Sequence, residues 1–399
     1  MTLNVRTDLT PAEIAHEHFR FGAAFEAPNA KAALVKPRHL PLRIGYVSGD
    51  YKASPVTWFI KPVLEHHDRT RVTTYCYSNV AIEDEVTARV KPHADYWRKI
   101  HGMSDDAVCD LIQSDKIDVL VDLSGHTLGN RLGVFARRPA MVQATWLGYL
   151  NTTGLKSIDF RITDRHTGPE GVTEELHSEA LLRMPESQWC WVPFYDVPAK
   201  AAFGRRERLV FGSFNYAGKV NAETLDLWSR VLREVPDSEL RIHAVSQPEF
   251  RATMLERLEA RQIARDRVTF VPHLAIEKYF DAFREVDIAL DTMPYNGGTT
   301  TFVTYWMGVP MVALAGNRGI ARGGYSIAKS AGLEELIALD ADQYVETNVR
   351  LATDDGFRVA LARSLRDRLM QSALADAKRF TRDLEALFEE MIERKVASS

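Results

Sequence analysis

Short apolar runs alternate along the chain with longer amphipathic stretches. A strand with one solvated face shows strict alternation of polar and apolar residues, and these runs do not. Near-continuous apolar runs are typical of parallel strands that are buried on both faces. The stretches between them carry apolar residues at helical spacing, for example Leu225, Trp228, Val231 and Leu232. Strands that alternate with helices in this way predict an α/β protein built on doubly wound parallel sheets.

Two such series follow one another. The first has predicted strands over 42–48, 72–77, 117–123, 142–147 and 160–164, and the second over 209–214, 240–245, 268–271, 286–290 and 309–314. Between them, from 189 to 200, the pattern lapses into a run rich in Trp, Pro and aromatic residues, which places a domain boundary there. This run is either a docking surface or an interdomain packing segment.

The ends of the chain add further helices. Thr10, Pro11 and Glu13 form a typical helix start, so we expect a lone helix to about Phe25, then a proline-bearing linker over 27–41. The predicted division is a helix and linker over 1–41, a first Rossmann-like lobe over 42–200, a second over 201–375, and a C-terminal helix over 376–399.

Composition narrows the class of protein. The chain has 399 residues, enough for two domains, and a net charge of -4, which gives no overall attraction to nucleic acid or anionic membranes. Cys76, Cys109 and Cys190 are the only cysteines, and no Cys-x-x-Cys pair occurs. This argues against a disulfide framework and fits a reducing cytoplasm. No apolar run is long enough to span a membrane, so we expect a cytoplasmic protein.

The stretch 287–301 is the strongest candidate for chemistry. A buried strand ends in a turn that contains Asn296, Gly297 and Gly298, and the threonines at 299–301 then open a predicted helix over 300–307. Unpaired backbone N–H groups and the positive dipole end at a helix start attract anions, and threonine hydroxyls add donors. The stretch is therefore a candidate phosphate site. The alternative is a plain N-capped βαβ unit without a ligand.

Two more candidates follow predicted strands. His126 and Thr127 lie in a glycine-bearing turn after the strand 117–123, where a histidine could hold a sugar or phosphate oxygen or simply bond its own loop. Lys219 comes shortly after the strand 209–214 and Asn215, where its compact cation could reach a diphosphate. The alternative for Lys219 is a solvated lysine before a helix.

Several motifs are missing. The chain has no G-x-x-x-x-G-K-[ST] and no G-x-G-x-x-G followed by an acid, which argues against a nucleoside triphosphatase and a dinucleotide enzyme. No Cys/His spacing typical of a metal site occurs, so we expect metal-free catalysis. Two lobes that face a cleft would suit a nucleotide-linked substrate.

Several stretches spread over the chain form a recognisable set: 43–50 (RIGYVSGD), 118–127 (DVLVDLSGHT), 135–140 (FARRPA), 146–149 (WLGY), 152–155 (TTGL), 211–215 (FGSFN) with Lys219, 287–301 (DIALDTMPYNGGTTT) and 306–310 (WMGVP). With these stretches, the sequence over about 43–390 resembles the catalytic region of the O-linked N-acetylglucosamine transferase family, in its bacterial O-GlcNAc transferase/SPINDLY-like branch. The family's tetratricopeptide array is absent from this sequence.

The resemblance implies a GT-B fold and inverting, metal-independent transfer of a sugar, N-acetylglucosamine in this family, from a UDP-sugar to a protein Ser or Thr hydroxyl. It implies no cofactor beyond the UDP-sugar donor, and flagellin or another bacterial protein is a candidate acceptor. Lys219 would stabilise the leaving UDP. The other implied donor-site residues are Asn215, Tyr279, Asn296, Gly298, Thr299, Thr300, Thr301 and Arg322, with His126 and Thr127 on the first lobe.

Three positions depart from the family pattern. Ser54 stands where a histidine is common, and serine cannot take up a proton near neutral pH. Tyr279 replaces a histidine thought to lie against the uracil, although tyrosine can still stack. Val303 replaces an acidic residue and cannot accept a hydrogen bond.

These departures keep other functions open. The chain could be a catalytically weakened relative that binds a nucleotide-sugar or a protein partner. It could also transfer another sugar or use a non-protein acceptor, since folds of this type host many reactions. Acceptor choice would come from the lobes, the N-terminal helix or a separate partner protein.

Overall fold

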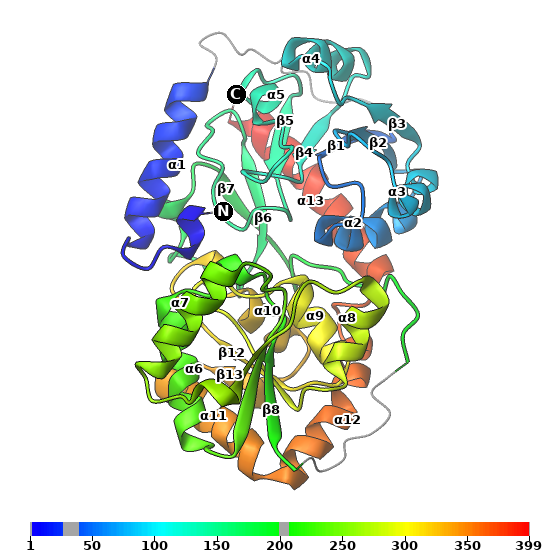
Figure 1. The fold of residues 1–399 in the computed structure, drawn as a ribbon. Coiled ribbons are helices and arrows are strands. Elements are labelled where there is room, and N and C mark those ends of the chain that lie inside the picture. Colours follow the sequence, from blue (N-terminus) through cyan, green and yellow to red (C-terminus); the bar gives the residue numbers. More distant parts are fainter. Residues whose placement is uncertain (1, 27–39, 199–206, 399) are drawn as a thin grey trace. The chain divides into compact units, whose positions relative to one another are not determined.

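The computed structural model describes residues 2–26, 40–198 and 207–398. The chain forms two compact units, each with its own sheet (Figure 1). The first unit comprises 9–194 and 373–399, and the second comprises 2–8 and 195–372. Most of the predicted linker over 27–41 lies outside the described residues.

The first unit is built on a seven-stranded parallel sheet with the order β3-β2-β1-β4-β5-β6-β7. Its strands are β1 (Leu42–Ser48), β2 (Val72–Ser78), β3 (Tyr96–Lys99), β4 (Val119–Asp122), β5 (Val142–Thr145), β6 (Phe160–Asp164) and β7 (Ala180–Met184). The chain order reverses between β1 and β4. This reversal is the switch point of a Rossmann-type sheet, where such folds bind ligands.

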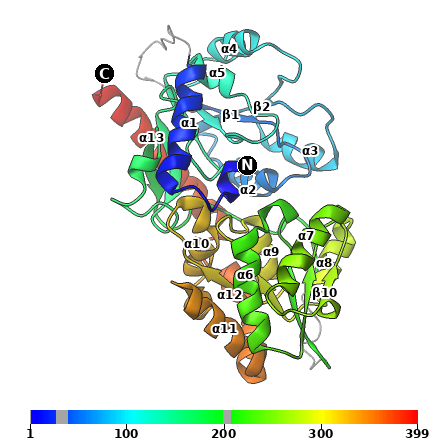
Figure 2. The same cartoon turned by 60° about the vertical axis from the view of Figure 1, so that its left-hand side comes forward.

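Helices cover this sheet. They are α1 (Pro11–Phe25), α2 (Pro55–His66), α3 (Glu85–Val90), α4 (Asp105–Ser114), α5 (Leu132–Ala136) and α13 (Ala377–Ala397). One core cluster fills the space between the sheet and α4 and α5, with Ile112, Leu120 and Phe135 fully buried. The last helix, α13, red in Figure 2, packs against α2, β5 and β7.

The second unit repeats the plan with six parallel strands in the order β10-β9-β8-β11-β12-β13. Its strands are β8 (Leu209–Ser213), β9 (Ser238–Ile242), β10 (Val268–Phe270), β11 (Ile288–Leu290), β12 (Met311–Leu314) and β13 (Ile337–Ala338). Its helices are α6 (Ala222–Glu234), α7 (Pro248–Glu259), α8 (Ile276–Phe283), α9 (Thr299–Trp306), α10 (Gly323–Ser330), α11 (Ala341–Thr353) and α12 (Asp355–Gln371). In Figure 2, α6 and α11 lie side by side, and they are in contact. The switch point falls between β8 and β11.

The predicted α/β class with doubly wound parallel sheets is confirmed. The sequence pattern missed β3, β7 and β13. Strand β3 is a half-exposed edge strand, β7 is also at an edge, and β13 has two residues, so none of them carries a buried apolar run. The docking-surface interpretation of the Trp-rich run is wrong, because Trp189 and Trp191 are 2% and 1% exposed. Among the described residues, no helix is both long and apolar enough to cross a membrane.

A buried hydrogen-bonded pair, His67 and Glu385, joins α13 to the end of α2, and burial lowers the pKa of His67, which favours its neutral ring. Glu385 accepts hydrogen bonds from His67 Nδ1 (2.9 Å) and from the backbone N–H of Asp68 (2.9 Å), while His67 Nε2 lies 2.8 Å from the hydroxyl of Tyr46. The side chains of His67 and Glu385 are 0% and 2% exposed. Water therefore cannot replace either partner.

We predict that Glu385→Ala lowers the free energy of unfolding by about 3 kcal/mol, because it leaves the buried ring N–H of His67 and the partly buried N–H of Asp68 without a partner. Denaturant unfolding followed by circular dichroism measures this. The matched control is Glu389→Ala, one turn further along α13, where the pair with Arg71 is solvent-exposed and contributes about 1 kcal/mol or less. Equal losses in the two variants would contradict the prediction.

Candidate functional site

Most of the predicted site residues of the second unit gather at its switch point. Asn215 lies just beyond the carboxyl end of β8, and Lys219 ends the short 3-10 helix Ala217–Lys219 that follows. The stretch 291–298 leaves the carboxyl end of the neighbouring strand β11 and leads into α9. Parallel sheets of this type bind ligands at this place.

Asp291, directly after β11, holds the site together. Its Oδ1 accepts hydrogen bonds from Asn215 Nδ2 and from the backbone N–H groups of Thr292 and Gly297, each at 2.9 Å. Its backbone carbonyl accepts from Trp228 Nε1 on α6 at 3.0 Å. Burial raises the pKa of Asp291 to about 6, partly offset by these donors and by Lys219. One carboxylate thus joins β8 to both ends of the turn 291–297.

The ammonium group of Lys219 is enclosed by the same turn. Its Nζ donates to the backbone carbonyl of Asn296 at 2.9 Å and lies 3.8 Å from the centre of the Tyr295 ring. Burial lowers the pKa of Lys219 to about 8, against the effect of Asp291, which raises it. Lys219 is therefore a held, partly desolvated cation and not the solvated lysine of the alternative interpretation.

Asn221 and Thr224 attach the turn to α6. Asn221 Nδ2 donates to the carbonyl of Met293 at 2.7 Å, and its Oδ1 caps α6 by accepting from the N–H of Thr224. The Thr224 hydroxyl donates to the Met293 carbonyl at 2.8 Å and accepts from the Met293 N–H at 3.0 Å. The turn is thereby fixed from both sides.

The threonines at the start of α9 have three different environments. Thr301 is fully buried and donates to the Gly297 carbonyl at 2.8 Å, so its hydroxyl serves the turn. Thr300 hydrogen-bonds the hydroxyl of Tyr279. Thr299 Oγ1 is a buried atom without a hydrogen-bond partner among the described residues, and Gly298 beside it is the N-cap. Thr299 is thus the one of the three whose hydroxyl remains available to a ligand oxygen.

The remaining predicted residues of this unit border the same place. Asn296 donates from Nδ2 to the Thr292 carbonyl at 2.9 Å, and its buried Oδ1 has no hydrogen-bond partner among the described residues. The ring of Tyr279 lies edge-on to Phe283, with centroids 5.1 Å apart. Arg322 donates to the Gly316 carbonyl at 2.9 Å at the start of α10.

The first unit holds the other two predicted residues, at its own switch point. His126 follows β4, and its Nε2 donates to the Thr153 carbonyl at 2.8 Å. Burial lowers the pKa of His126 to about 4, so the ring is neutral near pH 7 and Nδ1 keeps its lone pair. Thr127 donates to the Ser124 carbonyl at 2.8 Å. His126 therefore bonds its own loop and retains one accepting nitrogen.

The structure shows the surroundings of Ser54 and Val303, two of the positions that depart from the family pattern. Ser54 is the residue before α2, and it hydrogen-bonds the carboxylate of Asp50 after β1. Val303 is fully buried inside α9 and packs as a core residue. Neither side chain offers the acid–base group that the family commonly has at that position.

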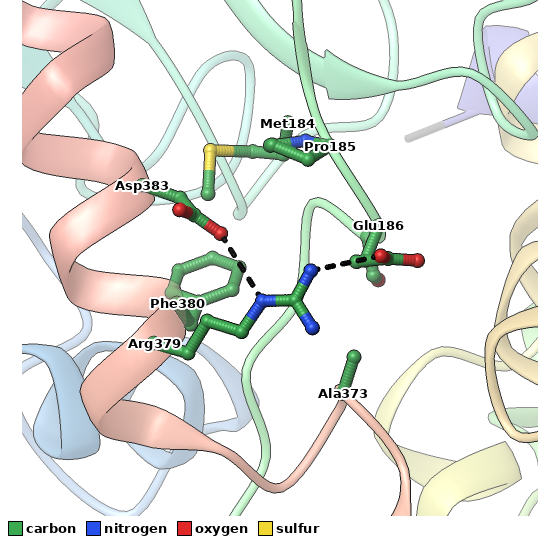
Figure 3. Close-up of a pocket in the computed structure, with 8 residues that line it drawn as sticks. Met184, Pro185, Glu186, Ala373, Arg379, Phe380 and Asp383 are labelled. Atoms are coloured by element: carbon green, nitrogen blue, oxygen red, sulfur yellow. Dashed lines mark hydrogen bonds and ion pairs between the residues drawn. The ribbon is translucent and has the colours of Figure 1, made fainter.

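A small pocket lies elsewhere in the first unit, between the end of β7 and the start of α13 (Figure 3). Arg379 lies between Glu186 (3.0 Å) and Asp383 (3.9 Å) and is paired with both. Arg379 is thus engaged by both carboxylates, and none of the predicted site residues lines the pocket. Among the described residues, no group of three or more His, Cys, Asp or Glu side chains could hold a metal ion.

The sequence model of glycosyl transferase family 41 matches residues 23–191 and 195–384. The chain belongs to glycosyl transferase family 41. A solved O-GlcNAc transferase mutant from Thermobaculum terrenum is 33% identical and has a TM-score of 0.91, over 99% of this chain and 76% of that one. The two-sheet architecture is therefore the GT-B fold of the O-GlcNAc transferase catalytic region. A glycosyltransferase from Rickettsia africae, 9% identical with a TM-score of 0.55 over 89% of this chain and 100% of its own, shares the fold alone.

Curated relatives agree with this membership. A protein from Solanum lycopersicum named probable UDP-N-acetylglucosamine–peptide N-acetylglucosaminyltransferase SPINDLY is 39% identical over 365 residues, which is 89% of this chain and 39% of that protein. The corresponding SEC protein of Arabidopsis thaliana is 30% identical over 367 residues, 88% of this chain and 37% of its own length. The chain thus spans about two fifths of the length of these relatives.

Sequence reasoning missed three residues that build the site: Asp291, Tyr295 and Asn221. A signal for Asp291 was present, because an acid directly after an apolar run and before a glycine turn is suited to bond the turn's N–H groups. Nothing local marked Tyr295 or Asn221, since their partners are 76 and 72 residues away in the chain. Only the fold brings them together.

Two neighbouring glycines test how tightly the turn is packed. A Cβ at Gly297 would lie 3.0 Å from Asn215 Oδ1 and from Thr301 Oγ1, whereas a Cβ at Gly298 would meet nothing within 4 Å. We predict that Gly297→Ala lowers the free energy of unfolding by about 2 kcal/mol through overpacking. Gly298→Ala loses only an N-cap preference, about 1 kcal/mol or less. Thermal unfolding of the pair measures this, and a larger loss for Gly298→Ala would contradict it.

Proposed function

We propose that this protein is a glycosyltransferase that moves N-acetylglucosamine from UDP-N-acetylglucosamine to Ser or Thr hydroxyls of a protein. Its family and the names of its relatives support the reaction class. The observation that carries the proposal is the Lys219 ammonium, held at the switch point of the second sheet beside the start of α9. A cation and a helix start together suit a diphosphate.

The proposed step needs strong stabilisation of the leaving group. The acceptor oxygen forms a bond to the anomeric carbon from the face opposite the diphosphate, the bond from that carbon to the diphosphate oxygen breaks, and UDP leaves with the electron pair. Negative charge therefore grows on the phosphate oxygens in the transition state. Lys219 can meet that charge, and Thr299 can donate a hydrogen bond to the same oxygens.

The acceptor proton needs a separate route. Ser54 cannot take it up near neutral pH. We propose that it leaves through water or a phosphate oxygen, and that His126 accepts a hydrogen bond from a substrate hydroxyl at its Nδ1. The fixed tautomer and lowered pKa of His126 support this role, because the ring presents an acceptor at neutral pH. Inversion and metal independence belong to the same proposal.

The second candidate function is a binding module without turnover. The observations that favour it are Ser54 and the buried Val303 in place of the family's histidine and acid. The two proposals differ in outcome, because a binding module would hold UDP tightly and release no sugar from UDP-N-acetylglucosamine. Labelling a bacterial lysate with the donor identifies the acceptor protein, for which flagellin is one candidate.

We predict that Lys219→Ala lowers kcat at least about 100-fold, because an electrostatic contact made in the transition state is lost. UDP release from UDP-N-acetylglucosamine with an acceptor protein measures it, and nuclear magnetic resonance of the product reads the anomer. Lys329→Ala is the matched control, since Lys329 is a surface lysine of the same unit that pairs with Glu334. Full turnover by Lys219→Ala would contradict the proposed role.

Metal independence has its own test. Loss of activity in EDTA that Mg²⁺ or Mn²⁺ restores would contradict it.

The pH dependence provides a further prediction. The Lys219 cation is present below its pKa of about 8 and lost above it, so we expect kcat/KM to fall about tenfold per pH unit above pH 8. The arginine in Lys219→Arg stays charged over this pH range. The activity that this variant retains should therefore lack the fall of kcat/KM above pH 8, which we call the alkaline limb of the profile. An identical alkaline limb in Lys219→Arg would assign the titration to another group.

A further inference from the structure

Tyr295 makes the closest ring contact to the proposed catalytic lysine. Lys219 Nζ lies 3.8 Å from the centre of the Tyr295 ring and 2.9 Å from the carbonyl oxygen of Asn296. An ammonium has three N–H donors. The carbonyl takes one and the ring face covers a second direction, which leaves donor capacity for a ligand oxygen.

The ring is fixed in this position by its own turn. Tyr295 is 8% exposed, and its backbone carbonyl accepts a hydrogen bond from the Thr292 hydroxyl at 2.6 Å. The next residue, Asn296, bonds back to the Thr292 carbonyl, and Asp291 holds the N–H of Gly297. These bonds hold the backbone that carries the ring, and the burial of Tyr295 restricts the ring's own movement.

A ring suits this position better than an acid. The negative face of an aromatic ring attracts a cation without neutralising it, whereas a carboxylate in contact would form an ion pair and compete with the diphosphate. The charged group that acts on Lys219 is Asp291, whose Oδ1 accepts three hydrogen bonds and whose buried Oδ2 has no hydrogen-bond partner among the described residues. Burial raises the pKa of Tyr295 itself to about 12, so its phenol stays neutral over the working range.

We infer that Tyr295 is a positioning residue whose ring face holds the Lys219 ammonium, charged and unpaired, in place for the leaving diphosphate. This inference rests on the proposed function. It deepens that function by assigning the lysine's orientation to an aromatic contact, and it predicts that the electron density of the ring sets the rate.

The test changes the electron density of the ring at constant shape. Phenylalanine at 295 removes only the hydroxyl, and pentafluorophenylalanine at 295 keeps nearly the same size while reversing the charge distribution of the ring. With pentafluorophenylalanine we expect kcat to fall about tenfold, and the alkaline limb of kcat/KM to move to lower pH by about one unit. Tyr295→Phe should keep most of the rate and the limb of the wild-type protein. Phe357→Leu removes the ring under Arg350 elsewhere in the unit, a 4.1 Å contact, and controls for the loss of a cation–ring contact as such.

The outcomes separate the two proposals. The role of the ring would be overturned if the proteins with phenylalanine and pentafluorophenylalanine at 295 had the same kcat and the same alkaline limb of kcat/KM. Their thermal unfolding must match for this comparison. A large loss already in Tyr295→Phe would assign the effect to the hydroxyl and also overturn it. If the wild-type protein turns over no donor, the proposed function fails. The pKa of Lys219, followed by the chemical shift of its labelled side chain in the same variants, then still tests the contact.

Discussion

The site of the second unit depends on one buried carboxylate. Asp291 directly follows β11. Its carboxylate accepts hydrogen bonds from Asn215, which lies beyond β8, and from the N–H groups at both ends of the turn 291–297. Without it, the turn would leave its own N–H groups buried and unpaired, at a cost of about 1–3 kcal/mol each. The carbonyl that binds Lys219 and the start of α9 both belong to this turn or follow it. Hydrogen bonds within the turn therefore set the positions of the Asn296 carbonyl and the Tyr295 ring, which are the two groups that contact the cation.

The first unit uses a similar arrangement. Asp122 ends β4, and it accepts hydrogen bonds from the N–H groups of Ser124 and Gly125 and from the hydroxyl of Thr145. Burial raises its pKa to about 6, as it does for Asp291. In both units a buried aspartate at the switch point shapes the turn that carries the candidate polar residue. The two units thus repeat the local chemistry of their sheet edges as well as the order of their strands.

The sequence allowed the fold class to be predicted, together with most of the residues that gather at the switch point of the second unit, because both rest on local signals. Buried strands such as β1 and β8 are apolar runs, and the turn before α9 is marked by glycines and threonines. The edge strands β3 and β7 were missed because they lack such runs. Within the site, the pattern predicted that Lys219 is functional but not how it is held, since Tyr295 and Asn296 approach it only in the folded chain. It also treated the three threonines alike, whereas burial and partners separate Thr301 and Thr300 from Thr299.

Lys219 is a partly desolvated cation, and we propose that it binds the diphosphate of the donor. The most direct measurement is the pKa of the Lys219 amine, followed by nuclear magnetic resonance of a labelled side chain, without and with saturating UDP. We predict a pKa near 8 in the free protein and a rise of at least one unit with UDP, because a nearby anion favours the charged form. A pKa that UDP leaves unchanged would mean that the diphosphate binds elsewhere or does not bind. Both explanations would contradict the proposed role of Lys219.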